Sequence, residues 1–255
     1  MIYISSTSGG TVGSVTFAAE DILKFDSVAK TSSLYFDGSD VGLSSASGTV
    51  VDAFRLMSDG SILFSFINPS TIPSVGSVDD SDIVRFMPTS LGTNTAGSFV
   101  WYFDGSDVGL TASGENIDVI GFAPDGRLIL STTGSFGVTG ASGEDEDLLA
   151  FTPTALGANT SGTWSLYFDG SDVGLGTSSS EDINGASTDP LTGKIYLTTV
   201  GSFSVTGVSG SGADIFVCTP GSLGSSTTCT HSSFWVGSQN GFGGEITDGV
   251  NVIQQ

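Results

Sequence analysis

Basic residues are scarce in this chain. Its 255 residues include 6 Lys and Arg against 27 Asp and Glu, which gives a formal net charge of −21. Such a charge repels the phosphate backbone of nucleic acids and anionic membrane surfaces, so we expect neither as a partner. With so few basic partners, most of the carboxylates must be solvated, screened by salt or neutralised by hard cations such as Ca²⁺.

Long apolar runs are also missing. No segment approaches the roughly 18 apolar residues of a membrane span, which predicts no membrane insertion. Residues 1–5 contain neither the basic region nor the apolar region of a signal peptide. We therefore expect either an intracellular protein or a chain from which a signal has been removed. The Gly/Ser/Thr-rich, Lys-poor composition favours the second, an extracellular or cell-surface protein.

No helical period of useful length is present. Frequent Gly, together with β-branched and aromatic residues, argues against helices and for strands. The chain is 38% hydrophobic and has 17 Phe, so it has ample material for a buried core. The sequence therefore predicts a folded, all-β protein.

One nine-residue motif recurs along the chain. The motif Tyr-Phe-Asp-Gly-Ser-Asp-Val-Gly-Leu stands unchanged at residues 35–43, 102–110 and 167–175, and a divergent copy occupies 234–242. The copies follow one another at intervals of 65 to 67 residues. A fixed period of this kind is the sequence signature of a repeat architecture.

The residues between two motifs predict a four-stranded meander. An Asp125-Gly126 turn between apolar runs is a strong hairpin signal, and Thr152-Pro153 is expected to end the third strand. A Gly/Ser-rich loop separates the second strand from the third. In the second unit the four predicted strands cover residues 117–123, 127–132, 147–151 and 163–168.

The two ends of the chain supply the parts of one split unit. Residues 1–7 match the second strands of the other units, and residues 245–250 match the start of their first strands. Closing a ring with a blade shared between the termini leaves no open sheet edge. We predict a single domain over 1–255, a four-bladed β-propeller with one blade completed by the N- and C-terminal segments. Its units are approximately 1–43 plus 245–255, 44–110, 111–175 and 176–244.

At the level of this pattern the sequence resembles bacterial surface-type β-propeller repeat proteins. The split blade and the blade number resemble those of the hemopexin-type ring, whose sequence signature is absent here. Two other architectures stay open. A β-solenoid would need shorter rungs. An open array, in which residues 245–253 pair with the first strand of the next molecule, would form a filament with the same local structure.

Carboxylates recur at fixed places in the units. Each clear motif copy carries two Asp residues three positions apart, and the next strand opens with further acid. Because the first strand of a unit starts where the previous fourth strand ends, we expect these acids to gather on one face. Ca²⁺ binds about six to eight oxygens, which predicts calcium at the turns between blades. The predicted ligands are Asp37, Asp40, Asp52, Asp104, Asp107, Asp118, Asp169 and Asp172.

Two other interpretations of these acids remain open. The Asp-Gly-Ser-Asp sequence is also typical of turns that bind no metal. Four aligned first-strand residues alternatively surround the central channel, either as an ion ring or as solvated strand caps. In the divergent motif Val236 and Gln239 replace the two Asp residues, so any metal site of that turn is lost. The aligned residues are Asp52, Asp118, Asn184 and Asp248.

The two cysteines and the one histidine all lie in the last unit. Cys218 and Cys229 fall on neighbouring antiparallel strands, which predicts a disulfide bond; the alternative is one buried Cys and one incidental thiol. His231 occupies the position of Trp164 in the preceding unit and has no nucleophile pattern around it. We therefore expect no enzyme activity.

Repetition of acids and aromatics in every unit favours a scaffold over a unique active site. We expect an extracellular structural or adhesive protein, stabilised by Ca²⁺ and able to assemble with itself into filaments. The alternative is a carbohydrate-binding module that uses aromatic and acidic residues of the rim to bind surface glycans. A glycoside hydrolase comes third, because no single pair of carboxylates stands out.

Overall fold

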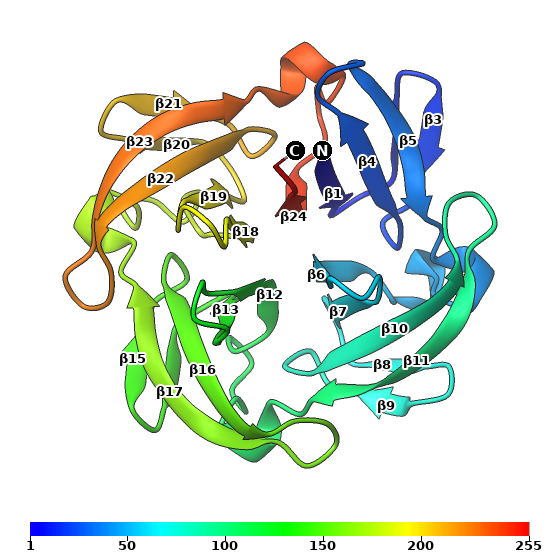
Figure 1. Cartoon of the computed structure of the whole chain (residues 1–255), viewed down its shortest axis with the longest axis horizontal. Coiled ribbons are helices and arrows are strands. Elements are labelled where there is room, and N and C mark those ends of the chain that lie inside the picture. The colour runs from blue at the N-terminus through cyan, green and yellow to red at the C-terminus, as the bar shows by residue number, and fades with distance from the viewer. Residues whose placement is uncertain (255) are drawn as a thin grey trace.

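Four antiparallel sheets of four strands each form a ring around a central axis (Figure 1). The computed structural model describes residues 1–254. The predicted all-β class and the four-bladed β-propeller are confirmed. Among the described residues there is no helix with the length and apolar character that crossing a membrane requires.

The blades are numbered along the chain, and each is a meander that runs outward from the axis. The strands next to the axis are β24 (Thr247–Val252), β6 (Val51–Leu56), β12 (Ile117–Phe122) and β18 (Gly185–Thr188) in blades 1 to 4. The second strands are β1 (Ile2–Ser6), β7 (Ile62–Phe66), β13 (Leu128–Thr132) and β19 (Ile195–Thr198). The third strands are β4 (Ile22–Asp26), β10 (Ile83–Ser90), β16 (Leu148–Ala155) and β22 (Ile215–Ser222). The outer strands are β5 (Thr31–Phe36), β11 (Ala96–Phe103), β17 (Ser161–Phe168) and β23 (Thr228–Trp235).

Blade 1 is assembled from both ends of the chain. Strand β24 pairs antiparallel with β1, and Ile4 lies opposite Val250. The amino group of Met1 donates a hydrogen bond to the carbonyl of Ile253 at 2.9 Å. The pairing covers a row of backbone groups that would otherwise be an open sheet edge. It closes the ring, as the sequence predicts.

A two-stranded hairpin stands between the second and third strands of every blade, where the sequence predicts only a loop. Each hairpin carries two buried apolar residues, such as Phe136 and Val138 in blade 3. The hairpins therefore extend the core rather than merely connecting strands. They are β2–β3 (Gly10–Val12, Val15–Phe17), β8–β9 (Ser70–Ile72, Gly76–Val78), β14–β15 (Phe136–Val138, Ala141–Gly143) and β20–β21 (Phe203–Val205, Val208–Gly210).

The prediction that Thr152-Pro153 ends the third strand is wrong, because β16 continues to Ala155. Pro153 lies opposite Gly162 on β17, next to a register shift between Pro153 and Ala155. Proline lacks a backbone donor, and sheets tolerate it at such irregularities. The extended β16–β17 hairpin reaches past its own blade toward the preceding one.

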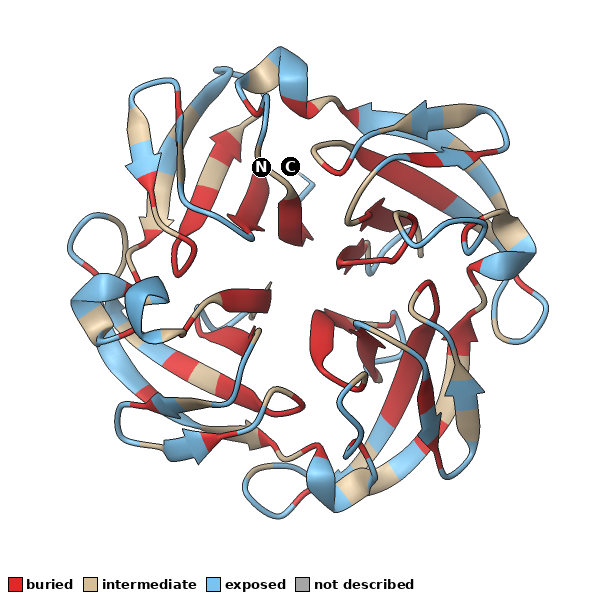
Figure 2. Cartoon of the chain, turned by 180° about the vertical axis from the view of Figure 1, so that it is seen from behind, coloured by how far each residue is buried: buried red, intermediate tan, exposed pale blue. Residues whose placement is uncertain are grey.

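The core lies between blades as well as within them. Burial is concentrated on the strands near the axis, while the outer strands are mostly exposed or half-buried (Figure 2). The motif residue Phe103 of blade 2 packs against Phe151 of blade 3, with 5.3 Å between ring centroids. Phe36 of blade 1 packs in the same way on Phe86 of blade 2 at 5.2 Å. At both interfaces an aromatic residue of the motif therefore packs between blades.

Candidate functional site

The nine-residue motif forms the turn that joins one blade to the next. After the outer strand, the chain makes a short 3₁₀ turn at η1 (Ser39–Val41), η3 (Ser106–Val108) or η4 (Ser171–Val173). In blade 2, a side chain on Gly105 would overlap the Ser81 carbonyl, so only glycine fits. Gly109 ends the turn with a φ of 98°, in the left-handed region that favours glycine. Both glycines of the motif are thus required by backbone geometry.

The second carboxylate of the motif and the backbone N–H of its first Asp fasten one blade to the next, whereas the carboxylate of the first Asp accepts a hydrogen bond from the Ser of its own motif. Asp107 accepts a hydrogen bond from the backbone N–H of Thr160 in blade 3, at 2.8 Å. The N–H of Asp104 donates to the hydroxyl of Thr160 at 2.9 Å, and that hydroxyl donates to the carbonyl of Gly157. Gly157 N–H in turn donates to the carbonyl of Tyr102 at 2.8 Å. We call this set of hydrogen bonds the clasp.

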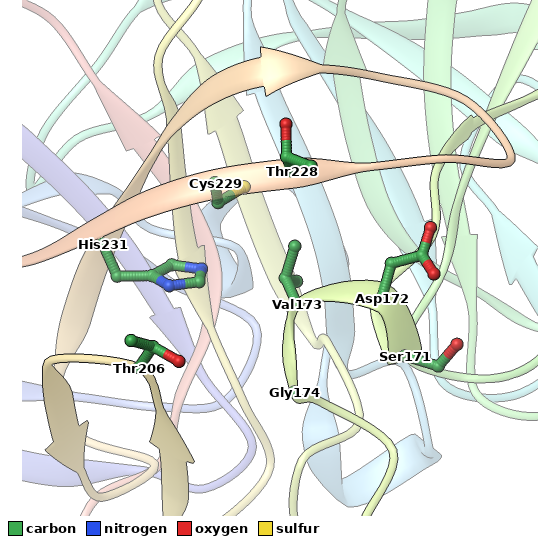
Figure 3. Close-up of a pocket in the computed structure, with 8 residues that line it drawn as sticks. All are labelled: Ser171, Asp172, Val173, Gly174, Thr206, Thr228, Cys229 and His231. Atoms are coloured by element: carbon green, nitrogen blue, oxygen red, sulfur yellow. The ribbon is translucent and has the colours of Figure 1, made fainter.

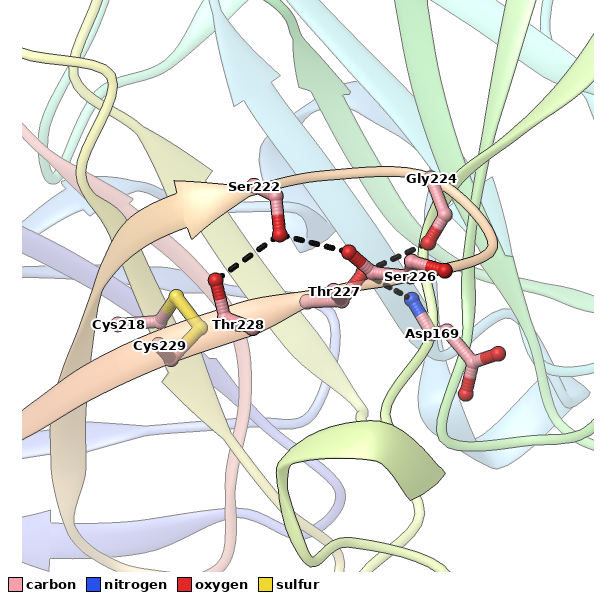
Figure 4. The surroundings of a disulfide bond; sticks show 8 residues. All are labelled: Asp169, Cys218, Ser222, Gly224, Ser226, Thr227, Thr228 and Cys229. Atoms are coloured by element: carbon pink, nitrogen blue, oxygen red, sulfur yellow. Dashed lines mark hydrogen bonds between the residues drawn. A yellow bond between two sulfur atoms is a disulfide. The ribbon is translucent and has the colours of Figure 1, made fainter.

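The clasp occurs at three of the four interfaces between blades. Thr95 makes the equivalent bonds to Asp37 and Asp40, and Thr227 makes them to Asp169 and Asp172; Figure 4 shows Thr227 with Asp169. All three threonines are nearly inaccessible to solvent. A motif in one blade therefore binds a loop about 55 residues later in the chain.

The fourth interface lacks both halves of the clasp. Blade 1 joins β4 to β5 by a short turn over 27–30, which has no equivalent of the clasp threonine. The motif that faces it has Val236 and Gln239 in place of the two aspartates. The acids and the loop that receives them are lost together. This joint loss indicates that the second Asp is in the motif to make the clasp.

The structure separates the predicted calcium ligands into two groups. Asp37, Asp40 and their equivalents lie at the outer interfaces between blades, whereas Asp52 and Asp118 lie on strands next to the axis. The two groups lie on different elements and do not form one cluster. Within residues 1–254 there is no group of three or more His, Cys, Asp or Glu positioned to hold one metal ion. Calcium binding at the turns stays a prediction.

The aligned first-strand residues do meet around the axis. Asp52, Asp118, Asn184 and Asp248 are 4, 1, 2 and 2% exposed, so they are buried rather than solvated caps. Asn184 donates to the carbonyl of Thr247 at 3.1 Å. By contrast, one oxygen of Asp52, both of Asp118 and one of Asp248 have no hydrogen-bond partner in the described chain. We call these four residues the axial ring.

Burial dominates the electrostatics of the axial ring. It raises the pKa of Asp52 to about 7. The pKa of Asp182, which lies outside the ring two residues before Asn184, is raised to about 8 by burial and then by the carboxylates of Asp145 and Asp52. The pKa values of Asp118 and Asp248 are raised well above their usual range, first by burial and then by neighbouring carboxylates. A buried carboxylate without a partner is costly in its charged form. Around neutral pH the ring therefore favours protons or cations over bare charges.

Cys218 and Cys229 form a disulfide bond between β22 and β23, with 5.2 Å between their Cα atoms (Figure 4). In blade 3 the same two positions hold Phe151 and Gly162, and a side chain on Gly162 would overlap the Phe151 ring. An aromatic ring that covers a glycine is a known way to stabilise paired strands. In blade 4 a covalent bond replaces that contact.

His231 borders a pocket of about 450 Å³ between blades 3 and 4 (Figure 3). Its equivalent in blade 3, Trp164, fills the corresponding space and donates its indole N–H to the carbonyl of Val108 at 3.0 Å. The shorter imidazole leaves the space open, and both of its nitrogens are buried without a hydrogen-bond partner in the described chain. Burial lowers the pKa of His231, so the ring is neutral at pH 7. No carboxylate or nucleophile among residues 1–254 is hydrogen-bonded to it.

Comparison with known proteins assigns no family to this chain. The chain matches no protein-family model, and a search of curated proteins finds no match either.

The clasp predicts a measurable loss of stability in one blade interface. Replacing Thr160 by Val removes one hydroxyl and leaves the Asp104 N–H and the Gly157 carbonyl without their partner. We expect the free energy of unfolding to fall by about 1–3 kcal/mol. Denaturant unfolding of Thr160→Val measures it, with the exposed Thr152→Val on β16 as the control. Equal stability of the two variants would contradict the role of the clasp.

The axial ring predicts that stability falls as pH rises. Because the raised pKa values make the folded state bind more protons than the unfolded chain, these groups stabilise the fold at low pH and lose that effect between about pH 4 and 8. Asp118→Asn should flatten this decline and raise stability at pH 8. Asn184→Asp should steepen it. Unfolding curves at pH 5 and 8 in a chelating buffer test both; a common slope for all three proteins would refute the idea.

Removing the disulfide should lower the free energy of unfolding, and a Phe–Gly pair at the same two positions should restore part of it. Replacing both cysteines by Ala removes the bond and leaves a gap, so we expect a loss of about 2 to 3 kcal/mol. Cys218→Phe with Cys229→Gly restores the contact of blades 2 and 3 and should be more stable than the double Ala variant. Thermal unfolding with and without a reducing agent is the measurement, and only the wild-type protein should respond to reduction.

Proposed function

We propose that this protein is a rigid structural or adhesive scaffold that acts outside the cell or at its surface, in the manner of the bacterial surface-type repeat proteins that its pattern resembles. The observation that carries the proposal is the clasp. The chemically most prominent motif of the chain is used inside the fold, at three interfaces, to fasten blades to one another. Because the motif residues hold neighbouring blades together, they support a mechanical role rather than catalysis.

Two further features support a location outside the cell. The Cys218–Cys229 disulfide is of a kind that persists in oxidising compartments. The net charge of −21 keeps a protein soluble and well separated from polyanions. In this setting the scaffold assembles with copies of itself or is displayed on a surface as an adhesive element.

The scaffold proposal is tested against its alternative, carbohydrate binding. A scaffold shows no saturable binding on an array of glycans, and electron microscopy of the purified protein shows uniform rings or ordered chains of rings. Saturable binding to one sugar class would overturn the scaffold in favour of a binding module. Turnover of any glycan in the panel would overturn both.

Calcium is part of this proposal as the stabilising ion. The carboxyl oxygens of Asp52, Asp118 and Asp248 that have no hydrogen-bond partner among residues 1–254 support it. Since no described group of three ligands is already in place, binding has to draw side chains together or retain water on the ion.

If Ca²⁺ is the stabilising ion, the size of its effect on the free energy of unfolding can be predicted. Ca²⁺ at ten times its dissociation constant should raise the free energy of unfolding by about 1.4 kcal/mol per site. Thermal unfolding at pH 7 with EDTA and with added CaCl₂ measures it, and MgCl₂ at the same ionic strength controls for screening. An unchanged melting temperature removes the ion from the proposal without affecting the scaffold.

A further inference from the structure

The basic residues of this acidic protein gather at one end of the ring. That end, which we call the hairpin end, carries the turns β6–β7, β12–β13 and β18–β19 together with the segments next to Met1 and Ile253. Arg85 and Arg127 pair there with the turn residues Asp59 and Asp125. The hairpin end is therefore the part of the surface that an anion can approach. The six basic residues are Lys24, Lys30, Arg55, Arg85, Arg127 and Lys194.

Arg55 differs from the other basic residues at this end. It lies on β6, and the positions aligned with it in the other three blades hold Gly121, Ser187 and Asn251, which are small and uncharged. Its Nη1 donates to the hydroxyl of Ser187 at 3.2 Å. Ser187 lies on β18, which stands across the axis from β6 (Figure 1). Gly121 has no side chain to obstruct that of Arg55.

Among residues 1–254 the guanidinium of Arg55 has no counterion. Its Nε–H is buried and has no hydrogen-bond partner in this part of the chain, and the two ion pairs found there do not include Arg55. Burial lowers the pKa of Arg55 to about 10, so the group remains charged at neutral pH. A buried charge without a partner is costly, and an anion would remove that cost.

A pocket of about 300 Å³ opens next to Arg55. Its walls come from Leu56 and Met57 after Arg55, from Leu191 on the β18–β19 turn, and from Val252 and Ile253 at the end of β24. Leu191 is 94% exposed, so its side chain is free to cover a ligand. This volume lies at the lower end of the range of about 300–1,000 Å³ for small-molecule pockets.

The one carboxylate in the pocket wall is already engaged. Asp189 accepts hydrogen bonds from the N–H of Leu191 at 2.8 Å and from the hydroxyl of Thr192 at 2.6 Å, within its own turn. Nearby Lys194 further favours its charged form and offsets its charge. Asp189 therefore neither neutralises Arg55 nor points a free charge at an incoming anion.

We propose that this pocket binds a small carboxylic acid with an apolar tail. The carboxylate accepts hydrogen bonds from the guanidinium of Arg55, whose planar fork suits a carboxylate. The tail lies against Leu56, Met57 and Leu191. Neither part suffices alone, because the charge selects an anion and the aliphatic walls select an apolar body. The site is independent of the scaffold role.

The test is a titration with three matched probes. Octanoate carries both parts, acetate only the charge, and 1-octanol only the tail. Backbone amide shifts of ¹⁵N-labelled protein should saturate with octanoate and centre on residues 55–57, 189–191 and 251–253. Acetate and 1-octanol should bind at least ten-fold more weakly. No saturable shift with octanoate in the wild-type protein at millimolar concentration overturns the proposal.

Variants assign the binding to Arg55. Arg55→Met should weaken octanoate binding roughly ten-fold or more, whereas Arg55→Lys should retain part of it. Arg127→Met, at the same end but paired with Asp125, is the matched control and should bind as the wild type does. Leu191→Ser, at an exposed position, tests the tail contact even if Arg55→Met does not fold. Equal octanoate affinity in Arg55→Met, or in Leu191→Ser, contradicts the site.

Discussion

Each blade of this protein can bury its apolar faces only against its two neighbours, and the whole structure depends on that constraint. Phe36, Phe103 and Phe168 of the motif are each fully buried between one blade and the next. An open row of blades would leave one such face exposed at each end. The pairing of β1 with β24 prevents this by making the first blade out of both ends of the chain.

The clasp explains why so polar a motif recurs unchanged within one chain. Its residue types meet separate requirements: the aromatic fills the interface, the first glycine permits close approach, the second takes a positive φ, the first aspartate accepts a hydrogen bond from the Ser of its own turn, and the second aspartate binds the next blade. Where the receiving threonine is missing, the aspartates are missing too. Such joint loss inside one molecule is a more direct indication of function than the repetition itself.

The sequence predicted the ring because its signals are local or periodic. The motif spacing, the Asp125-Gly126 turn and the likeness of the two ends each depend on residues close in sequence or on alignment between units. The clasp escaped prediction because it joins Asp107 to Thr160, far apart in the chain, although a recurring Leu-Gly-x-x-Thr at 91–95, 156–160 and 223–227 was available as a signal. Asp118 is buried and Arg55 has no counterion among the described residues because closure of the ring brings the first strands of all four blades together around the axis. No local sequence pattern encodes that closure.

Closing four strands around an axis forces any polar residue on them to share a narrow, poorly hydrated space with its three equivalents. A fourfold repeat would place four carboxylates there, and Asn184 reduces the number to three while donating a hydrogen bond of its own. On the same strands, toward the hairpin end, Arg55 occurs once and its equivalents are neutral. Asn184 in place of a fourth Asp therefore reduces the repulsion between like charges at one level of the axis. At another level, toward the hairpin end, Arg55 places a single positive charge. Those two departures from repetition, more than the repeated residues, give the two ends of the channel different chemistry.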